Sequence, residues 1–183
     1  KMEREWKNND HVSIEFNPEI IFTEWPRTKS ISVNRGPLTY SIRIKENWVK
    51  KNIDEFGWDE WEILPASDWN YGIPIEEFET SDIRIKKSKT ILKQPWSTDD
   101  VPIVLEIPAK KILKWKATLK NTVDPLREGP VRSNEETEWI EMIPMGAARL
   151  RLTCLPVISE KVNARYWEDI PDPNHFMLER LTH

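Results

Sequence analysis

Aromatic side chains are the residues of this sequence with the clearest capacity for ligand recognition. The 183-residue chain contains ten Trp, five Phe and three Tyr. Because sugar rings present C–H faces that stack on indole rings, exposed Trp side chains often mark carbohydrate-binding surfaces. Trp58, Trp69 and Trp96 lie in segments expected to be loops, and together with Tyr71 they are the candidate carbohydrate-binding residues. The alternative is that Trp69 and Tyr71 only plug one end of the fold.

Carboxylates offer a second possible chemistry, acid–base catalysis. Glycosidases place two carboxyl groups either about 5 Å or about 6.5–9.5 Å apart around the bond that they cleave. The chain has 31 acidic residues, and several of them are adjacent in sequence. Neighbouring residues on a strand point to opposite faces, so such pairs do not flank one substrate. We interpret the carboxylates as a solvated charged surface and predict no catalytic residue.

The sequence lacks the spacings typical of metal-binding, nucleophilic and cofactor-binding motifs. The three His residues have no His-x-x-x-His spacing, and neither Gly-x-Ser-x-Gly nor a Gly-rich phosphate loop occurs. Cys154 is the only Cys, which excludes a disulfide within the chain and a Cys-based zinc site. Its alternation with Leu150 and Leu152 predicts a buried, inert thiol. We therefore predict no metal site and no cofactor, and an enzyme complete within these residues is not expected.

The charge and hydropathy of the chain limit its partners. The net charge is −4 with acidic and basic residues well mixed, so nucleic acid is not an expected partner. No apolar run approaches the roughly 18 residues that a membrane span requires. No signal peptide is evident, and Lys1 before Met2 indicates either an added residue or a longer parent chain. The compartment, cytoplasmic or else secreted or periplasmic in a bacterium, stays open.

The elements that must position these residues are organised around residues 30–44. This stretch holds two runs of strictly alternating apolar and polar residues, which predicts two strands with one buried face each. The runs are separated by Asn34-Arg35-Gly36-Pro37. Gly36 supplies backbone freedom and Pro37 fixes φ, so we expect a sharp turn or bulge between antiparallel strands.

The remaining segments predict an antiparallel β-sandwich, jelly-roll-like, with long aromatic loops and hardly any helix. Residues 45–60 have apolar spacings that fit a short helical turn or an ordered excursion better than a strand. We expect a lead-in arm over residues 1–10, the sandwich over 11–158, and an irregular C-terminal tail over 159–183 packed on it, with a possible short helix at 175–181. Further strands are predicted at residues 11–16, 19–25, 61–64, 82–87, 101–107, 112–119, 139–143 and 147–155.

Segments in a fixed order resemble the C-terminal region of the β-L-arabinofuranosidase-like proteins, the glycoside hydrolase family 127 type. Residues 33–40, Val-Asn-Arg-Gly-Pro-Leu-Thr-Tyr, resemble an "ERGPLVY" signature. Residues 61–72 resemble "xxLPxSPWNYxL", with Asp68 where Pro is frequent. Residues 101–116 resemble a strand pair ending in "xIPxWxx", of which only the Trp is kept. Residues 141–152 resemble "LxLIPYGxxxLRIxxFP", with Met replacing the common Tyr.

The resemblance implies a β-sandwich that accompanies a large (α/α)6 catalytic barrel. In that family the nucleophilic Cys and the zinc ligands lie in the barrel, so none of them can be assigned to this chain. The first hypothesis is therefore a non-catalytic accessory domain whose partner is the barrel of the same parent protein. The second is an independent carbohydrate-binding module that binds plant-type glycans with loop aromatic residues. The sugar that the parent protein would cleave is not specified by the sequence.

Overall fold

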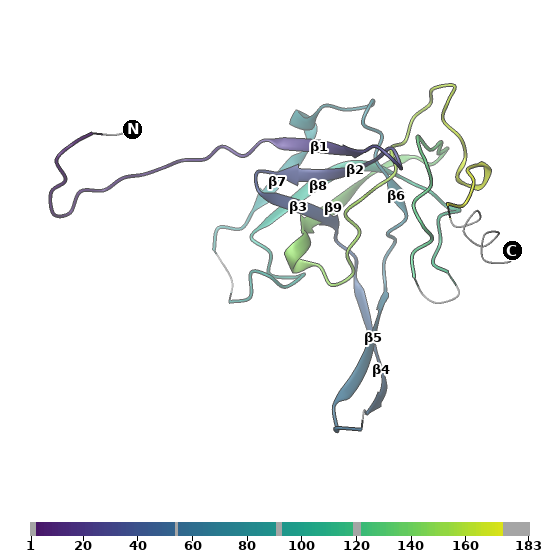
Figure 1. Cartoon of the computed structure of the whole chain (residues 1–183), viewed down its shortest axis with the longest axis horizontal. Coiled ribbons are helices and arrows are strands. Elements are labelled where there is room, and N and C mark those ends of the chain that lie inside the picture. The colour runs from purple at the N-terminus through teal and green to yellow at the C-terminus, as the bar shows by residue number, and fades with distance from the viewer. Residues whose placement is uncertain (1–2, 54, 91–92, 119–121, 174–183) are drawn as a thin grey trace, which may run out of the picture.

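The computed structural model describes residues 3–53, 55–90, 93–118 and 122–173, and these fold as an all-β protein (Figure 1). The only helical elements among them are the short 3₁₀ turns η1 (Thr80–Asp82), η2 (Met145–Ala147) and η3 (Trp167–Asp169). The prediction of an all-β, antiparallel, sandwich-like fold is confirmed. The strands are β1 (Ile20–Trp25), β2 (Ser30–Arg35), β3 (Leu38–Ile42), β4 (Glu46–Ile53), β5 (Asp59–Pro65), β6 (Tyr71–Gly72), β7 (Arg84–Lys87), β8 (Ile103–Lys111) and β9 (Thr137–Pro144).

One antiparallel sheet forms the body of the molecule. Its strands follow the order β1-β2-β3-β9-β8-β6, and β7 pairs with another part of β8. The tight connection between β2 and β3 is the predicted turn, with Gly36 at φ +57°. A Cβ at this position would lie 2.9 Å from the Cβ of Pro18, so both backbone conformation and space favour glycine.

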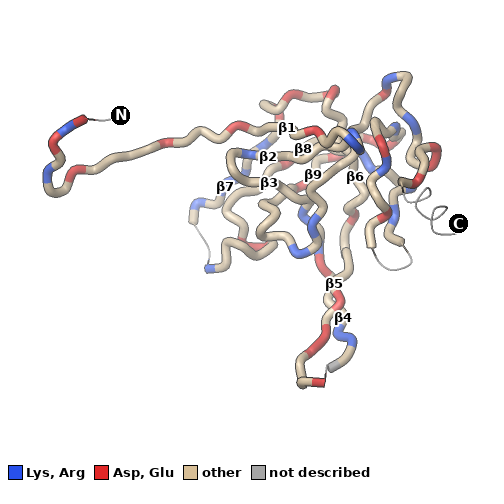
Figure 2. The backbone as a smooth tube through the Cα atoms, in the orientation of Figure 1, with Lys and Arg blue, Asp and Glu red and all other residues tan. Residues whose placement is uncertain are grey.

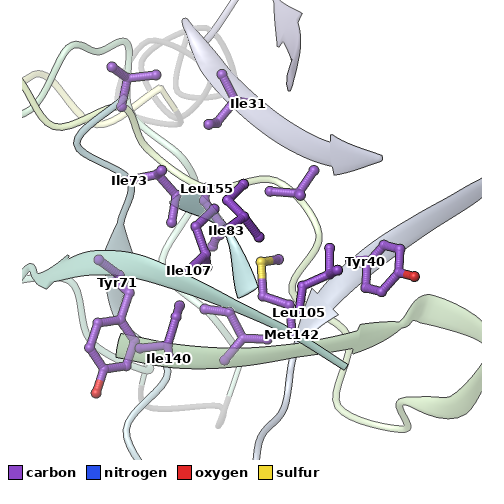
Figure 3. Close-up of a cluster of buried hydrophobic side chains, with 14 of the residues drawn as sticks. Ile31, Tyr40, Tyr71, Ile73, Ile83, Leu105, Ile107, Ile140, Met142 and Leu155 are labelled. Atoms are coloured by element: carbon purple, nitrogen blue, oxygen red, sulfur yellow. The ribbon is translucent and has the colours of Figure 1, made fainter. Parts of the chain in front are cut away.

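The core lies on one face of this sheet. Alternate residues of β2, β3, β8 and β9 point into it, including Val33, Leu105 and Met142, which are fully buried. Two irregular segments cover this face, because Ile31 bridges to Leu155 and Ile73 bridges to Val157. Among the labelled side chains of Figure 3, Leu105 and Met142 of the sheet lie close to Ile73 and Leu155 of the covering segments. The second layer is therefore held by single bridges and side-chain packing rather than by a continuous strand ladder.

A second cluster joins the C-terminal region to the body. Trp115 is fully buried, and its ring centroid lies 5.2 Å from that of Trp167 in η3. Ile170 packs in the same cluster, together with Val131. The part of the C-terminal segment that the structure describes, up to residue 173, thus lies against the body. The helix expected at residues 175–181 lies outside the described residues.

The hairpin formed by β4 and β5 is a sheet of its own and projects from the body (Figure 1). Of the two alternatives expected for residues 45–60, the helical turn is wrong, because most of this segment is β4 and the hairpin turn; the segment does leave the body, but as a strand. The hairpin has solvent on both sides, so its apolar residues are not restricted to one face. Without one buried face, a strand loses the two-residue period on which the prediction depended.

Three further strand predictions are corrected. Residues 11–16 alternate but form no ladder, and they extend away from the body with Phe16 83% exposed. Alternation shows that a segment could bury one face, but it does not provide a partner. Residues 112–119 begin with a turn in which Trp115 N–H donates to the Ile112 carbonyl, and Leu113 is exposed while Trp115 is buried. Residues 147–155 follow η2 as an irregular covering segment.

Candidate functional site

A groove of about 930 Å³ lies where the β4–β5 hairpin leaves the body. It is lined by residues of β3, β9 and the start of β6, by the hairpin base and by the loop around residues 98–99. Its volume is in the range of sites that hold small organic ligands. The side chains at its surface that carry charge or an aromatic ring are Arg43, Lys45, Glu46, Trp48, Asp68, Tyr71, Asp99, Glu138, Trp139, Glu141 and Arg149.

Four successive residues of β9, from Glu138 to Glu141, line the groove. Ile140 and Met142 point into the core, so Trp139 and Glu141 point outward. The backbone N–H of Arg43 donates to the carbonyl of Glu141, which places these residues side by side. Their side chains form an ion pair with Arg43 Nη1 3.0 Å from Glu141 Oε2. The floor of the groove is therefore a fixed pair of opposite charges next to an outward-facing indole.

A row of ion pairs continues from Glu141 across the sheet. Glu106 on β8 lies directly opposite Glu141, and Lys86 Nζ is 2.6 Å from Glu106 Oε1 and 3.2 Å from Glu141 Oε1. Burial acts to raise the pKa of Glu141, but the hydrogen bonds from Lys86 and Arg43 outweigh it and lower the pKa. Glu141 is thus ionised at neutral pH and cannot serve there as a general acid.

On the hairpin side, Glu46 holds the groove wall together. Its carboxylate accepts hydrogen bonds from Trp48 Nε1 at 3.0 Å, Thr98 Oγ1 at 3.2 Å and Arg149 Nη1 at 3.3 Å. The Arg149 guanidinium carbon also lies 5.3 Å from the centroid of the Trp48 ring. These contacts hold the guanidinium over one face of the indole, and the two form the Trp48–Arg149 wall of the groove, in which Trp48 remains 45% exposed.

Trp139 forms a second aromatic surface of the groove. The guanidinium carbon of Arg84 lies 3.9 Å from the centroid of the Trp139 ring and covers one face of it. Arg84 does not line the groove, whereas Trp139 does and is 43% exposed. One face of the indole is therefore supported by Arg84, and the side chain remains part of the groove surface.

At the far end of the groove, Tyr71 is almost completely buried, with 6% of its surface exposed. Burial, followed by the charge of Glu138, raises the pKa of Tyr71 to about 12. Lys111 Nζ lies 2.8 Å from Asp68 Oδ2 and 3.4 Å from Glu138 Oε1, and the hydrogen bond with Asp68 is the largest cause that raises the pKa of Lys111. Tyr71 is therefore a neutral phenol and Lys111 a cation at neutral pH.

The structure does not bring the predicted carbohydrate-binding residues together. Trp58 lies on the hairpin and is 74% exposed, and Trp96 lies in the loop between β7 and β8 and is 66% exposed. Trp69 is half-buried, with its ring centroid 5.3 Å from that of Trp115. Among the four predicted residues, only Tyr71 lines the groove. The burial of Trp69 and Tyr71 agrees with the alternative that they plug one end of the fold, and Figure 3 shows Tyr71 at the edge of the core cluster.

Sequence reasoning missed Trp48 and Trp139 as site residues. Trp139 occupies an outward position of β9, and this position could have been found from the alternation with Ile140 and Met142. Trp48 lies in the segment that was expected to be helical, so no signal in the sequence placed it beside β9. Trp48 and Trp139 line the same groove because of the direction in which the hairpin leaves the sheet, and this direction is a property of the tertiary fold.

We also searched the described residues for a metal-binding site and for a nucleophilic side chain at the groove. These residues contain no group of three or more His, Cys, Asp or Glu that could hold a metal ion. Cys154 is half-buried and its Sγ lies 3.4 Å from Ser32 Oγ, away from the groove. No helix in the described part of the chain is both long and apolar enough to cross a membrane.

Each carboxylate that lines the groove has a basic partner. Glu46 pairs with Arg149, Asp68 and Glu138 pair with Lys111, and Asp99 and Glu141 pair with Arg43. Such an arrangement can both accept and donate hydrogen bonds to a ligand.

No family model matches the chain, and neither a curated protein nor a solved structure matches it.

Proposed function

We propose that this chain is the non-catalytic accessory β-sandwich of a glycoside hydrolase of the β-L-arabinofuranosidase-like type, and that it docks on the (α/α)6 catalytic barrel of its parent protein. The proposal starts from the sequence segments that resemble this family. Their positions in the fold are compatible with it, because Gly36 forms the β2–β3 turn and residues 141–144 belong to β9. The paired carboxylates of the groove support a role without catalysis.

The observation that carries the docking role is the aromatic surface of the projecting hairpin. Phe56 and Trp58 are exposed near its turn, and Trp48 and Trp61 are about half exposed closer to the body. Trp48 and Trp61 contact each other edge to face, with ring centroids 6.1 Å apart. An isolated two-stranded hairpin is only marginally stable in water, and a cluster of exposed aromatic residues marks an interaction surface.

The charges of the hairpin favour a protein partner over a lipid surface. Lys50 pairs with Asp59 at 2.7 Å and Lys51 pairs with Glu62 at 2.6 Å, so both signs flank the aromatic residues. Figure 2 shows acidic and basic residues interspersed along this hairpin and along the body. Aromatic residues surrounded by a rim of mixed charges are typical of protein interfaces.

Docking can be tested with the two parts as separate proteins. The (α/α)6 barrel of a β-L-arabinofuranosidase-like protein, produced without its sandwich, is titrated with this chain in a calorimeter. We expect binding that Phe56→Ala and Trp58→Ala each weaken about tenfold or more, as hot-spot aromatic residues do. Trp96→Ala removes an equally exposed indole outside the hairpin and is the matched control. Absence of binding to any barrel tested, or equal loss in the control, would contradict the docking role.

A second candidate function is an independent carbohydrate-binding module, favoured by the exposure of Trp58 and Trp96. This function predicts that the isolated chain binds plant-type glycans and that Trp58→Ala or Trp96→Ala abolishes the binding. The two indoles lie on different elements, and neither lines the groove. For this reason the docking role is the function that we prefer.

A further inference from the structure

We propose that the groove at the base of the β4–β5 hairpin binds a neutral oligosaccharide, with Trp139 and the Trp48–Arg149 wall as its contact surfaces. This inference rests on the proposed function only in the expectation that the parent protein acts on carbohydrate. The geometry of the groove itself does not depend on a barrel. The site differs from the loop aromatic residues singled out in the sequence, since it contains neither Trp58, Trp69 nor Trp96.

Trp139 has the properties of a sugar-stacking residue. Arg84 covers one face of the indole, with its guanidinium carbon 3.9 Å from the ring centroid. The neighbouring residue on β8 is Pro108, which is buried and lies opposite Trp139 in the strand register. The ring is therefore fixed before a ligand arrives, and little conformational entropy is lost when a sugar ring packs on its open surface. A mobile surface indole would not offer this advantage.

The Trp48–Arg149 wall is also fixed in advance. Glu46 is only 10% exposed at its side chain and binds Trp48 Nε1 and Arg149 Nη1 together. Thr98 Oγ1 lies 3.2 Å from a carboxylate oxygen of Glu46 and 3.2 Å from the carbonyl of Ala147, so its one proton can be donated to either, which ties the wall to the segment after β9. The groove thus has a pre-ordered wall at the base of the hairpin and a second indole on β9.

The floor supplies groups that match sugar hydroxyls. A hydroxyl both donates and accepts, so it can bind the carboxylate and the guanidinium of one ion pair at the same time. Arg43 has five N–H donors, and the contacts to Glu141 and Asp99 use two of its nitrogens. Charge-assisted hydrogen bonds of this kind are stronger than those between neutral groups. The pair also fixes the position of both partners before binding.

The balance of charge selects the class of ligand. The groove is lined by five carboxylates, those of Glu46, Asp68, Asp99, Glu138 and Glu141, and by only three basic side chains. Every carboxylate already has a basic partner, and two of the three lining cations, Arg43 and Arg149, are held in these ion pairs. An anionic sugar would have to compete with Glu141 and Glu46 for these two guanidinium groups. A neutral glycan with several free hydroxyls fits the lining best.

The test uses the isolated chain with ¹⁵N-labelled Trp, followed by NMR during titration. The probes are neutral arabino- and xylo-oligosaccharides, with an oligogalacturonide as the anionic comparison. The indole N–H signals of Trp48 and Trp139 are assigned with Trp48→Phe and Trp139→Phe variants. We expect these two signals to shift with a neutral probe, and we expect Trp139→Ala to weaken binding about tenfold or more. Trp139→Phe keeps an aromatic face and should retain part of the affinity.

Trp58→Ala is the matched control, because it removes an exposed indole of the same hairpin outside the groove. This variant should bind the probes as well as the original chain. The proposal is overturned if no probe shifts the two signals at millimolar concentration, if the shifts are confined to Trp58 or Trp96, or if the anionic probe binds more tightly. The dispersion of the remaining indole signals shows whether each variant is folded. Because no barrel is present, failure of this test leaves the docking role standing, and failure of docking leaves this result unchanged.

Discussion

The guanidinium carbon of Arg84 lies 3.9 Å from the centroid of the Trp139 ring, although the two residues belong to strands that are not adjacent. Arg84 is on β7 and Trp139 on β9, and β8 runs between them. Glu106 on β8 lies directly opposite Arg84 in the strand register. Glu106 also belongs to the row of ion pairs that continues through Lys86 and Glu141 to Arg43. A long side chain thus reaches over one strand to support an indole on the next.

Removal of this support should have a small, measurable effect. Arg84→Ala is expected to lower the free energy of unfolding by about 0.5–1 kcal/mol, the usual contribution of an exposed cation–π contact. Urea unfolding followed by circular dichroism measures it. Arg4→Ala is the control, because Arg4 lies 4.9 Å from the ring of Trp6 in the N-terminal arm, and its removal should leave the unfolding midpoint unchanged. Equal effects of the two variants would contradict the structural role of Arg84.

The ion pairs of Glu141 should make stability depend on acidity. Since its pKa is lowered in the folded protein, its contribution is fully present above the ordinary value of 4.5 and is lost as the pH falls through the lower, folded value. Glu141→Gln is therefore expected to be less stable than the original chain by up to about 1 kcal/mol at pH 7, with the difference vanishing in acid. Urea unfolding at a series of pH values measures this difference. A constant difference would contradict the assignment, and Glu136→Gln controls for the loss of one exposed charge.

Tyr71 should make the folded protein less stable as the pH rises, whereas Glu141 makes it less stable as the pH falls. Its pKa is raised from 10.0 to about 12, so its contribution is fully present below pH 10 and is lost as the pH rises through 12. The original chain should lose stability relative to Tyr71→Phe over this range. Unfolding free energies at pH 9 to 12 measure the effect, and absorbance at the phenolate band should show one Tyr that ionises late and is missing in the variant. Parallel curves for both proteins would show that Tyr71 is not shielded.

The sequence predicted the parts of the fold in which one face of a strand is buried. Residues 30–44 alternate strictly and form β2 and β3, and the outward position of Trp139 follows from the same rule applied to β9. Alternation of apolar and polar residues failed as a predictor where a segment buries no face or packs without a regular strand. Residues 11–16 alternate without a partner strand, and the β4–β5 hairpin has no buried face. The covering layer is held by single bridges such as Ile31 to Leu155, which leave no regular pattern in the sequence.

The candidate site shows the same limit. Trp58 and Trp96 were chosen as loop residues, and both are exposed, but a binding surface also requires that side chains from distant segments meet. Glu46 and Arg149 are more than a hundred residues apart in sequence and form one ion pair. No local pattern encodes such a contact. Exposure of single residues could be predicted, whereas their convergence could not.

The buried and the exposed indoles should differ sharply in their effect on stability. Trp115 is fully buried between Trp69 and Trp167, and its Nε1 donates to the Asp124 carbonyl at 2.8 Å. Trp115→Ala is expected to lower the free energy of unfolding by about 3–5 kcal/mol, through lost burial and a cavity. Trp58→Ala should change it by less than about 0.5 kcal/mol. Thermal and urea unfolding measure both, and similar losses would mean that the hairpin packs on the body.

The hairpin can also be shortened as a whole. The pair Lys50 and Trp61 lies directly opposite in the register, so residues 51–60 can be replaced by Asn-Gly, which favours the tight turn of a two-residue hairpin. Because the described contacts of this hairpin with the body lie at Glu46 and Trp48, the shortened chain should keep its unfolding free energy within about 0.5 kcal/mol. It should keep the groove, and with it any binding of neutral oligosaccharide. Because it lacks Phe56 and Trp58, it should lose affinity for the barrel.

The control is a chain with the same residues 51–60 in scrambled order, which keeps length and composition. A shortened chain that still binds the barrel would move the docking surface to another part of the molecule, and one that unfolds would show that the hairpin belongs to the core.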